Sequence, residues 1–260
     1  PWGFGRDTRS DWAKELDVKI WDKDNPTKYL YFVGCNGAFD ERGKKIAKAV
    51  VHSLKSAGVD FSILGNDEGC TGDPARRAGN EYLFDLLASR NAELFKEKSI
   101  IKIVTHCPHC FNSLKNEYSE FGVELDVIHH SELLAHLIKN GEGIGKGKDP
   151  DNVVYHDSCY LGRHNKIYDA PREMVAHSSK SGKVLDVDAS RERGTCCGAG
   201  GGRFLLEEKT DERMSHQRVD QLMEANPDTI AVSCPFCVLM FEDALKAKNL
   251  QDTVKVKDIS

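Results

Sequence analysis

The spacing of nine cysteines is the feature that most constrains how this 260-residue chain can fold. Cysteines recur at nearly constant distances along the sequence. The matches are Cys107 with Cys234, Cys110 with Cys237 and Cys70 with Cys197 at an offset of 127 residues, and Cys35 with Cys159 at an offset of 124. Repeated offsets are hard to obtain by chance. They predict that the chain consists of two homologous halves.

The sequence between the cysteines alternates strand-like and helix-like segments. Aromatic and β-branched runs predict strands at 28–34, 59–64, 100–105 and 123–130, and then at 153–159, 183–188, 229–233 and 254–259. Apolar periodicity predicts helices at 40–58, 75–97, after Cys107 and at 131–139, and then at 165–177, 207–225 and 235–248. We therefore expect an α/β fold of two homologous halves with largely parallel sheets. Most of the cysteines follow predicted strand ends, the edge at which open α/β sheets bind ligands.

The sequence divides into four predicted segments. Residues 1–27 form a lead-in segment, 28–139 the first cysteine-rich half, 140–152 a linker and 153–260 the second cysteine-rich half. The linker is predicted from NGEGIGKGKDPDN, which is glycine-rich and charged without periodicity. Because the sequence opens on Pro1 without an initiator methionine, we expect it to be part of a longer chain.

Composition argues against several classes of protein. A hydrophobic content of 40%, a charged content of 30% and a net charge of -5 are typical of a soluble globular protein, not of a nucleic-acid binder. No apolar run approaches the roughly 20 residues of a membrane span, and the N-terminus lacks a signal-peptide pattern. An odd number of cysteines without a secretion signal favours thiolate chemistry in the cytoplasm over a disulfide framework.

The CPHC and CPFC motifs predict reactive sulfurs at helix N-termini. Cysteine at the N-cap, proline at the first helical position and cysteine at the third place both sulfurs where the helix dipole favours thiolate. A single CPHC after a strand is also typical of a thioredoxin-like redox pair, and a buried packing pair is the simplest alternative. Because both halves carry the motif with further cysteines at matching spacings, we favour metal ligation. Four thiolates suit either zinc or a 4Fe–4S cluster.

The segment GTCCGAGGGRF distinguishes the second half. Together with the other cysteines it offers five sulfurs, one more than zinc or a cubane takes from the protein. The five are Cys159, Cys196, Cys197, Cys234 and Cys237. We expect Gly198 and Gly200 to let the backbone approach a bulky cluster, to which exposed N–H groups can donate. The glycine spacing does not fit a phosphate-binding loop.

The first half lacks the cysteine pair, because it reads GCTGDP where the second half reads TCCGAG. Aligning the glycines places Thr71 opposite Cys197, whereas the constant offset pairs Cys70 with Cys197. Either alignment leaves four cysteines. We expect them to hold a 4Fe–4S cubane, with zinc or a cluster that has a non-cysteine ligand as the alternatives. They are Cys35, Cys70, Cys107 and Cys110.

These motifs resemble a known family. Cys159, Cys196-Cys197-Gly198 and Cys234-Pro-Phe-Cys237 resemble the cysteine-rich CCG domain of the B and D subunits of heterodisulfide reductase and of related iron–sulfur subunits. The resemblance covers nearly all of residues 28–260. The stretches WGFGRDTRSDWA, CTGDPARRAGNEYLF and YHDSCYLGRHN are most similar to the branch linked to electron-transfer flavoproteins.

The resemblance implies a non-cubane 4Fe–4S cluster on the five cysteines of the second half. It implies an iron–sulfur oxidoreductase that passes electrons between an electron-transfer flavoprotein, or another redox partner, and a membrane quinone-linked chain. An upstream ferredoxin-like or membrane haem region would hold this domain on the cytoplasmic face of the membrane.

Two other functions remain open at this point. The domain could reduce a thiol disulfide, with Cys196 and Cys197 in catalytic roles, although the family mechanism uses two five-cysteine sites and this chain has one. It could also be a zinc-stabilised interaction scaffold without redox chemistry.

Several histidines lie near predicted strand ends, and we expect ordinary hydrogen bonding for most of them. His156 and Arg163 flank Cys159 and are the candidates for catalytic roles, in which Arg163 could also offset the negative charge of a thiolate-rich cluster. The others are His106, His109, His129, His130 and His164.

Overall fold

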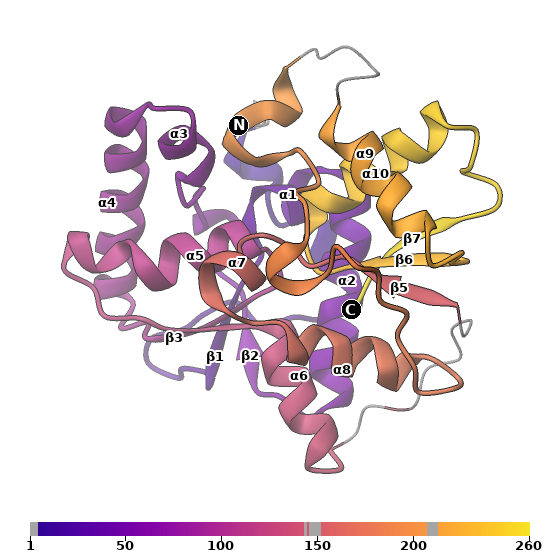
Figure 1. Ribbon diagram of the computed structural model, residues 1–260. Helices are drawn as coiled ribbons and strands as arrows, with labels where there is room; N and C mark the ends of the chain where they lie inside the picture. Colours follow the sequence, from indigo (N-terminus) through magenta and orange to yellow (C-terminus); the bar gives the residue numbers. More distant parts are fainter. Residues whose placement is uncertain (1–4, 143–144, 146–151, 207–212) are drawn as a thin grey trace. The chain divides into compact units, whose positions relative to one another are not determined.

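The computed structural model describes residues 5–142, 145, 152–206 and 213–260 (Figure 1). The chain divides into two compact units, Pro1–Ile144 and Gly145–Ser260. This boundary falls in the glycine-rich segment expected as a linker. Residues 143–144 and 146–151 of that segment, and the first residues of the helix expected at 207–225, lie outside the described residues.

The first unit contains a four-stranded parallel sheet in the order β2-β1-β3-β4. Its strands are β1 (Tyr29–Phe32), β2 (Phe61–Ser62), β3 (Lys102–Thr105) and β4 (Asp126–His129). The helices are α1 (Gly34–Phe39), α2 (Glu41–Ser56), α3 (Asp73–Arg77), α4 (Glu81–Glu97), α5 (Pro108–Asn116) and α6 (His130–Lys139). Parallel strands joined through helices are the expected α/β arrangement.

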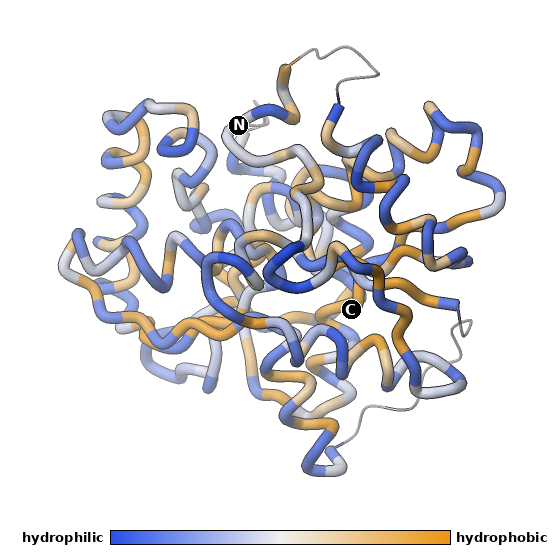
Figure 2. The backbone as a smooth tube through the Cα atoms, viewed as in Figure 1, coloured by the Kyte–Doolittle hydropathy of each residue, from blue (hydrophilic) through white to orange (hydrophobic). Residues whose placement is uncertain are grey.

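The strands form because their side chains are apolar on both faces. Leu30, Tyr31 and Phe32 of β1 and Ile103 and Val104 of β3 are fully buried. Continuous apolar runs of this kind are typical of parallel strands covered on both sides. Figure 2 shows β3 and β5 as hydrophobic segments, whereas α4 alternates polar and apolar residues along its length.

The second unit repeats the strand order of the first. Its strands β5 (Val153–Tyr155), β6 (Thr229–Val232) and β7 (Lys255–Asp258) are parallel in the order β5-β6-β7. A single parallel bridge between Val154 and Leu185 lies at the position that corresponds to β2. The helices are α7 (Gly162–Asn165), α8 (Asp169–Ser178), α9 (Met214–Met223) and α10 (Pro235–Ala247). The prediction of an α/β fold with parallel sheets and an internal repeat is confirmed.

The strand predicted at 183–188 is wrong. Only Leu185 pairs with β5, through its N–H and the carbonyl oxygen of Val153 at 2.8 Å. The next residue, Asp186, instead directs its carboxylate to Arg172 at 2.9 Å. The pairing with β5 is therefore limited to one bridge.

Two predicted helices differ in their bounds. The helix predicted at 75–97 is divided at Gly79, whose φ of +81° is left-handed, and Asn80 then caps α4 by accepting from the N–H of Leu83. The helix predicted at 165–177 is α8 and begins later, at Asp169, because Lys166 has a left-handed φ of +60° and ends the short helix α7. The strand predicted at 28–34 is shorter, because it ends at Phe32 and the chain turns into α1 at Gly34.

The segment before β1, expected as a lead-in, packs on the first unit over its described residues. Trp12 and Trp21 are buried. The indole N–H of Trp21 donates to the carbonyl oxygen of Lys98 at 3.0 Å, and Ile20 forms a parallel bridge with Ile63 beside β2. This segment therefore extends the edge of the first sheet.

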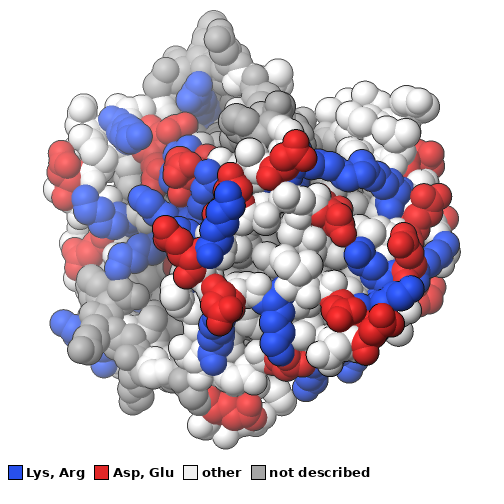
Figure 3. Space-filling model, turned by 180° about the vertical axis from the view of Figure 1, so that it is seen from behind, with Lys and Arg blue, Asp and Glu red and all other residues white. Residues whose placement is uncertain are grey.

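Charges are mixed on the surface. On the face shown in Figure 3, lysine and arginine side chains are interspersed with aspartate and glutamate. Among the described residues, no helix combines the length and the hydrophobicity needed to cross a bilayer.

Candidate metal centres

The cysteines of the first half lie where strands end. Cys35 is in the first turn of α1 after β1, and Cys70 lies in the loop between β2 and α3. Cys107 is the N-cap of α5, with Pro108 at the first helical position and Cys110 in the first turn, as predicted for CPHC. Cys70 lies near enough to Cys35, and Cys107 near enough to Cys110, to raise the pKa of Cys35 and Cys110. The four thiols thus meet at one edge of the sheet.

The five cysteines of the second half are arranged in the same way. Cys234 is the N-cap of α10, and Cys237 lies in its first turn. Cys159 lies between β5 and α7, and Cys196 and Cys197 lie in the loop before the short 3-10 segment Gly200–Leu205. The sulfurs of Cys197 and Cys237 are 3.2 Å apart. All nine cysteines are free thiols.

Local geometry decides which cysteines correspond. The sulfur of Cys70 accepts from the N–H of Gly72 at 3.4 Å, and the sulfur of Cys196 accepts from the N–H of Gly198 at 3.3 Å. Both glycines have a left-handed φ, +86° and +91°. The two loops therefore have the same turn, so Cys70 corresponds to Cys196.

Pairing Cys70 with Cys197 at an offset of 127 is therefore wrong, and the alignment of the glycines is right. Thr71 occupies the place of Cys197, since its hydroxyl lies 3.9 Å from the sulfur of Cys110. Cys197 likewise contacts Cys237, the second cysteine of the other motif. The two sites differ at this one position by a thiol.

The corresponding cysteines are also the easiest to ionise. The thiol of Cys35 donates to the sulfur of Cys70 and, with the N–H of Gly72, lowers the pKa of Cys70 to about 6 despite burial. The thiols of Cys159 and Cys197 donate to Cys196 and hold its pKa well below the usual value for cysteine. The same hydrogen bond raises the pKa of Cys159. Each site thus has one sulfur prepared as a thiolate.

Carboxylates that the sequence reasoning missed hold the cysteine loops. Glu68 is 2% exposed and accepts from the N–H groups of Val33 and Gly34, both at 2.9 Å, and from Arg9 at 2.6 Å. Asp157 of the second half is buried and accepts from both terminal nitrogens of Arg172 and from the N–H of Arg191. Glu68 and Asp157 each stand two residues before a cysteine, Cys70 or Cys159, and this matching position in the two halves could have identified them from the sequence.

The two residues suggested for catalysis have different surroundings. Arg163 is largely exposed and donates to the carbonyl oxygen of Gly194, which holds the loop before Cys196. His156 is buried, and one of its ring nitrogens and the sulfurs of Cys197 and Cys237 all lie within 4.8 Å of one another. Burial lowers the pKa of His156 to about 3, so the ring is neutral near pH 7.

The glycines predicted beside a cluster also differ. A Cβ added at Gly198 would lie 3.2 Å from the Cβ of Met214, in addition to the strain of its left-handed φ. A Cβ added at Gly200 would meet no atom of the described residues within 4 Å. The described part of the fold thus favours glycine at 198 and places no atom against a side chain at 200.

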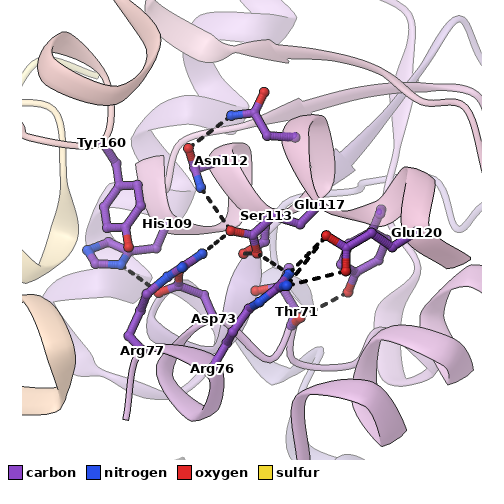
Figure 4. A network of polar contacts seen from close by, with 12 residues as sticks. Thr71, Asp73, Arg76, Arg77, His109, Asn112, Ser113, Glu117, Glu120 and Tyr160 are labelled. Carbon is purple, nitrogen blue, oxygen red and sulfur yellow. Dashed lines mark hydrogen bonds and ion pairs between the residues drawn. The ribbon is translucent and has the colours of Figure 1, made fainter. Parts of the chain in front are cut away.

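A polar network surrounds CPHC in the first half (Figure 4). The ring of His109 bonds to the carboxylate of Asp73 at 2.7 Å, and Arg77 donates to the same carboxylate at 3.1 Å. Burial raises the pKa of Asp73, but these two partners outweigh it and the net shift is downward. Arg77 also pairs with Glu117 at the end of α5. The network fastens α3 to both ends of α5.

The donor chemistry of both sites fits thiolate-ligated iron–sulfur clusters. Cysteine sulfur at helix N-termini is the ligand that such clusters use. The backbone is also shaped around sulfur, because a Cβ added at Gly34 would lie 3.0 Å from the sulfur of Cys110. Four sulfurs in the first half match a cubane or zinc, and five in the second half exceed both.

Comparison with protein families finds the CCG cysteine-rich domain twice in the chain. The matched residues are 29–115 and 153–242, one match in each half. These ranges contain all nine cysteines.

Curated relatives match the whole chain. It is 42% identical to the probable iron-sulfur-binding oxidoreductase FadF of Bacillus subtilis and 41% identical to the EtfAB:quinone oxidoreductase of Syntrophomonas wolfei, over 100% of this chain and 38% of each relative. It is also 34% identical to one polypeptide of the dihydromethanophenazine:CoB–CoM heterodisulfide reductase of Methanosarcina barkeri, over 94% of this chain and 59% of the relative. The chain therefore spans well under half the length of the first two.

Proposed function

The chain belongs to the CCG cysteine-rich domain family, and from this premise we propose that it transfers electrons through two unlike iron–sulfur clusters. Its relatives are named as an iron–sulfur-binding oxidoreductase and a heterodisulfide reductase subunit. The donor is an electron-transfer flavoprotein and the acceptor a membrane quinone-linked chain. The observation that carries the proposal is the difference between the sites, four sulfurs with Thr71 in one and five with Cys197 in the other.

The ligand sets follow from the sulfurs that meet at each site. Cys35, Cys70, Cys107 and Cys110 would hold a 4Fe–4S cubane. The five cysteines of the second half would hold a non-cubane 4Fe–4S cluster, with the adjacent pair Cys196 and Cys197 accounting for the additional sulfur. When bound, each cluster supplies a centre that gains and loses one electron.

The chain's own groups would hold these clusters and adjust their charge. N–H groups of Gly72 and Gly198 already donate to Cys70 and Cys196, and hydrogen bonds to cluster sulfur stabilise the more negative, reduced state. Glu68 would keep the turn before Cys35 in place.

The partners are inferred from the relatives. The name of the Syntrophomonas wolfei relative specifies EtfAB as its partner and quinone as its acceptor, and a relative from Chromohalobacter salexigens at 35% identity is a probable membrane-anchored ferredoxin. We infer that the regions of the full protein outside this chain include a ferredoxin-like or haem-bearing membrane part on the cytoplasmic side.

Metal analysis tests the proposal first. Protein purified or reconstituted without oxygen should contain roughly eight irons and eight sulfides per chain, four for each cluster. Reduced electron-transfer flavoprotein should then bleach the visible absorption of the clusters within seconds. A colourless chain that binds only zinc would leave the non-redox scaffold as the function.

Disulfide reduction is the second candidate. Cys159 and Cys196 are partly exposed, whereas Cys197 is buried, so a substrate sulfur could reach this edge of the site. Splitting one disulfide into two thiols requires two electrons and two protons. A thiol heterodisulfide turned over by the wild-type chain and not by Cys196→Ser would support this reaction. Cluster reduction by the flavoprotein without any disulfide turnover would exclude it.

A further inference from the structure

Arg218 on α9 is buried among neutral partners. It is 0% exposed and has the largest volume of the fully buried side chains described. Its Nη1 donates to the carbonyl oxygen of Ala189 at 2.7 Å and to the side-chain oxygen of Gln221 at 3.0 Å, and its Nε donates to Nδ1 of His156 at 3.2 Å. No carboxylate of the described residues pairs with it, and Nη2 has no partner among them. A buried cation needs a compensating negative charge nearby.

The contact with Arg218 fixes the proton on His156. A guanidinium only donates hydrogen bonds, so Nδ1 of His156 must accept. A neutral imidazole that accepts at one nitrogen carries its proton on the other. Nε2 is therefore an N–H donor. It is buried and has no hydrogen-bond partner among the described residues.

Two cysteine sulfurs lie near the His156 ring. A ring nitrogen of His156 and the sulfurs of Cys197 and Cys237 all lie within 4.8 Å of one another. Phe241 packs edge-on against the His156 ring, with 4.7 Å between the ring centroids. The same neighbourhood could suggest that His156 is a metal ligand. The tautomer argues against this, because a ligating histidine donates from its second nitrogen, and here that nitrogen accepts.

We propose that Arg218 and His156 form a buried donor pair for the second metal centre, in which Arg218 orients the ring and supplies positive charge and Nε2–H of His156 donates to a sulfur at Cys197 or Cys237. The inference rests on the proposed function, since it requires a thiolate-ligated cluster on the second half. His156 is a positioning and tuning residue. Its donation stabilises the reduced, more negative cluster and raises its reduction potential.

The first half lacks both members of the pair. Tyr31 corresponds to Tyr155, because each pairs with the third residue of the strand that precedes its CPxC motif. The residue that follows is Phe32 in the first half and His156 in the second. Phe32 is apolar and fully buried.

Asn91 stands where the second half has Arg218, since both precede the first cysteine of their CPxC motif by the same number of residues. Asn91 is neutral and donates to the carbonyl oxygen of Cys70 and to the hydroxyl of Tyr118. The half with a fifth thiolate is therefore also the half with an additional buried cation. The sulfur of Cys237 and the carboxylate of Asp157 lie near enough to interact electrostatically with Arg218, so its positive charge would offset theirs.

Potentiometry of the iron-loaded chain, followed by electron paramagnetic resonance, tests the pair. His156→Phe copies the first half and should lower the equilibrium constant for reducing the second centre about tenfold, which is about 59 mV for one electron. The first centre should keep its potential in the same sample. His52→Phe is the matched control, since His52 is exposed on α2, and it should change neither potential.

Spectroscopy separates a donor from a ligand. Electron–nuclear double resonance should show an exchangeable proton coupled to the second centre, lost in D₂O and absent in His156→Phe. A strongly coupled nitrogen of His156 would instead mean direct ligation and would overturn the proposal.

Failure of the pair and failure of the proposed function give different results. A wild-type chain without iron and sulfide fails the proposed function itself. A loaded His156→Phe chain with unchanged potentials overturns the pair alone. If His156→Phe does not load, Arg218→Gln should lower the potential of the second centre selectively, and a loaded Arg218→Gln with both potentials unchanged would overturn the proposal equally.

Discussion

Removing the Glu68 carboxylate should destabilise the first unit and release its metal. Glu68→Ala leaves Arg9 buried at 6% exposure without its partner, and leaves the N–H groups of Val33 and Gly34 without their acceptor. Breaking a buried ion pair on one side costs about 3–5 kcal/mol, and each hydrogen bond to a charged group contributes roughly 1.5–3 kcal/mol. Because these contributions overlap, we expect a loss of about 3–5 kcal/mol in the free energy of unfolding.

The assay is urea unfolding followed by circular dichroism, for the wild type, both single variants and the double variant. Arg9→Met combined with Glu68→Ala should cost less than the sum of the two, since neither charge is then left alone. Glu41→Ala is the control, because Glu41 lies on α2 with its side chain 84% exposed, and it should leave the free energy of unfolding nearly unchanged. Iron should be lost from the first centre only, since Glu68 holds the turn before Cys35. A Glu68→Ala chain within about 1 kcal/mol of wild type would refute the argument.

Three further perturbations test the fold and the sites. Cys197→Thr should give the second centre a paramagnetic spectrum like that of the first, and Thr71→Cys should move the first toward the second; unchanged spectra in both would contradict the equivalence of these positions. Gly34→Ala adds a Cβ against the sulfur of Cys110 at a φ of +77° and should destabilise the fold more than Gly58→Ala. At Gly58 a Cβ would meet open space, so only the strain of a φ of +66° remains, about 1–2 kcal/mol. Equal losses of thermal stability in the two variants would contradict the role assigned to the sulfur. Burial lowers the pKa of His130, so the unfolded chain takes up a proton below about pH 6.5 that the folded chain does not. Lowering the pH from about 7.5 to about 5.5 should therefore cost about 1.4 kcal/mol of unfolding free energy through His130, in addition to the contributions of His106 and His156. His130→Gln should lack only its own part of this pH dependence, measured by urea unfolding at both pH values.

The repeat and the CPxC helices could be predicted because their signals are local. Cysteine, proline and cysteine at the start of α5 and α10 specify a helix N-terminus whatever surrounds them, and both helices begin there. Strand β3, expected from IIKIVT, also depends only on a short apolar run. These features need no information on the partner segments.

Other features depend on partners distant in sequence and escaped prediction. Leu185 forms one bridge where a strand was expected, and the side chain of the next residue, Asp186, contacts Arg172. Arg218 stands in a helix predicted only by its apolar periodicity, and the fold alone brings it into contact with His156. The correspondence of Cys70 required the turn geometry at Gly72, because counting residues gave a different partner.

The exchange of Thr71 for Cys197 has a consequence for how such a chain can evolve. After duplication of an ancestral half, one residue exchange at this position changes the number of thiolates in one copy, while the sheet, the CPxC helix and the glycine turn stay as they were. Selection can then act on the altered copy while its twin preserves the original ligand set. Duplication thus allows a new kind of centre to arise without the loss of the old one.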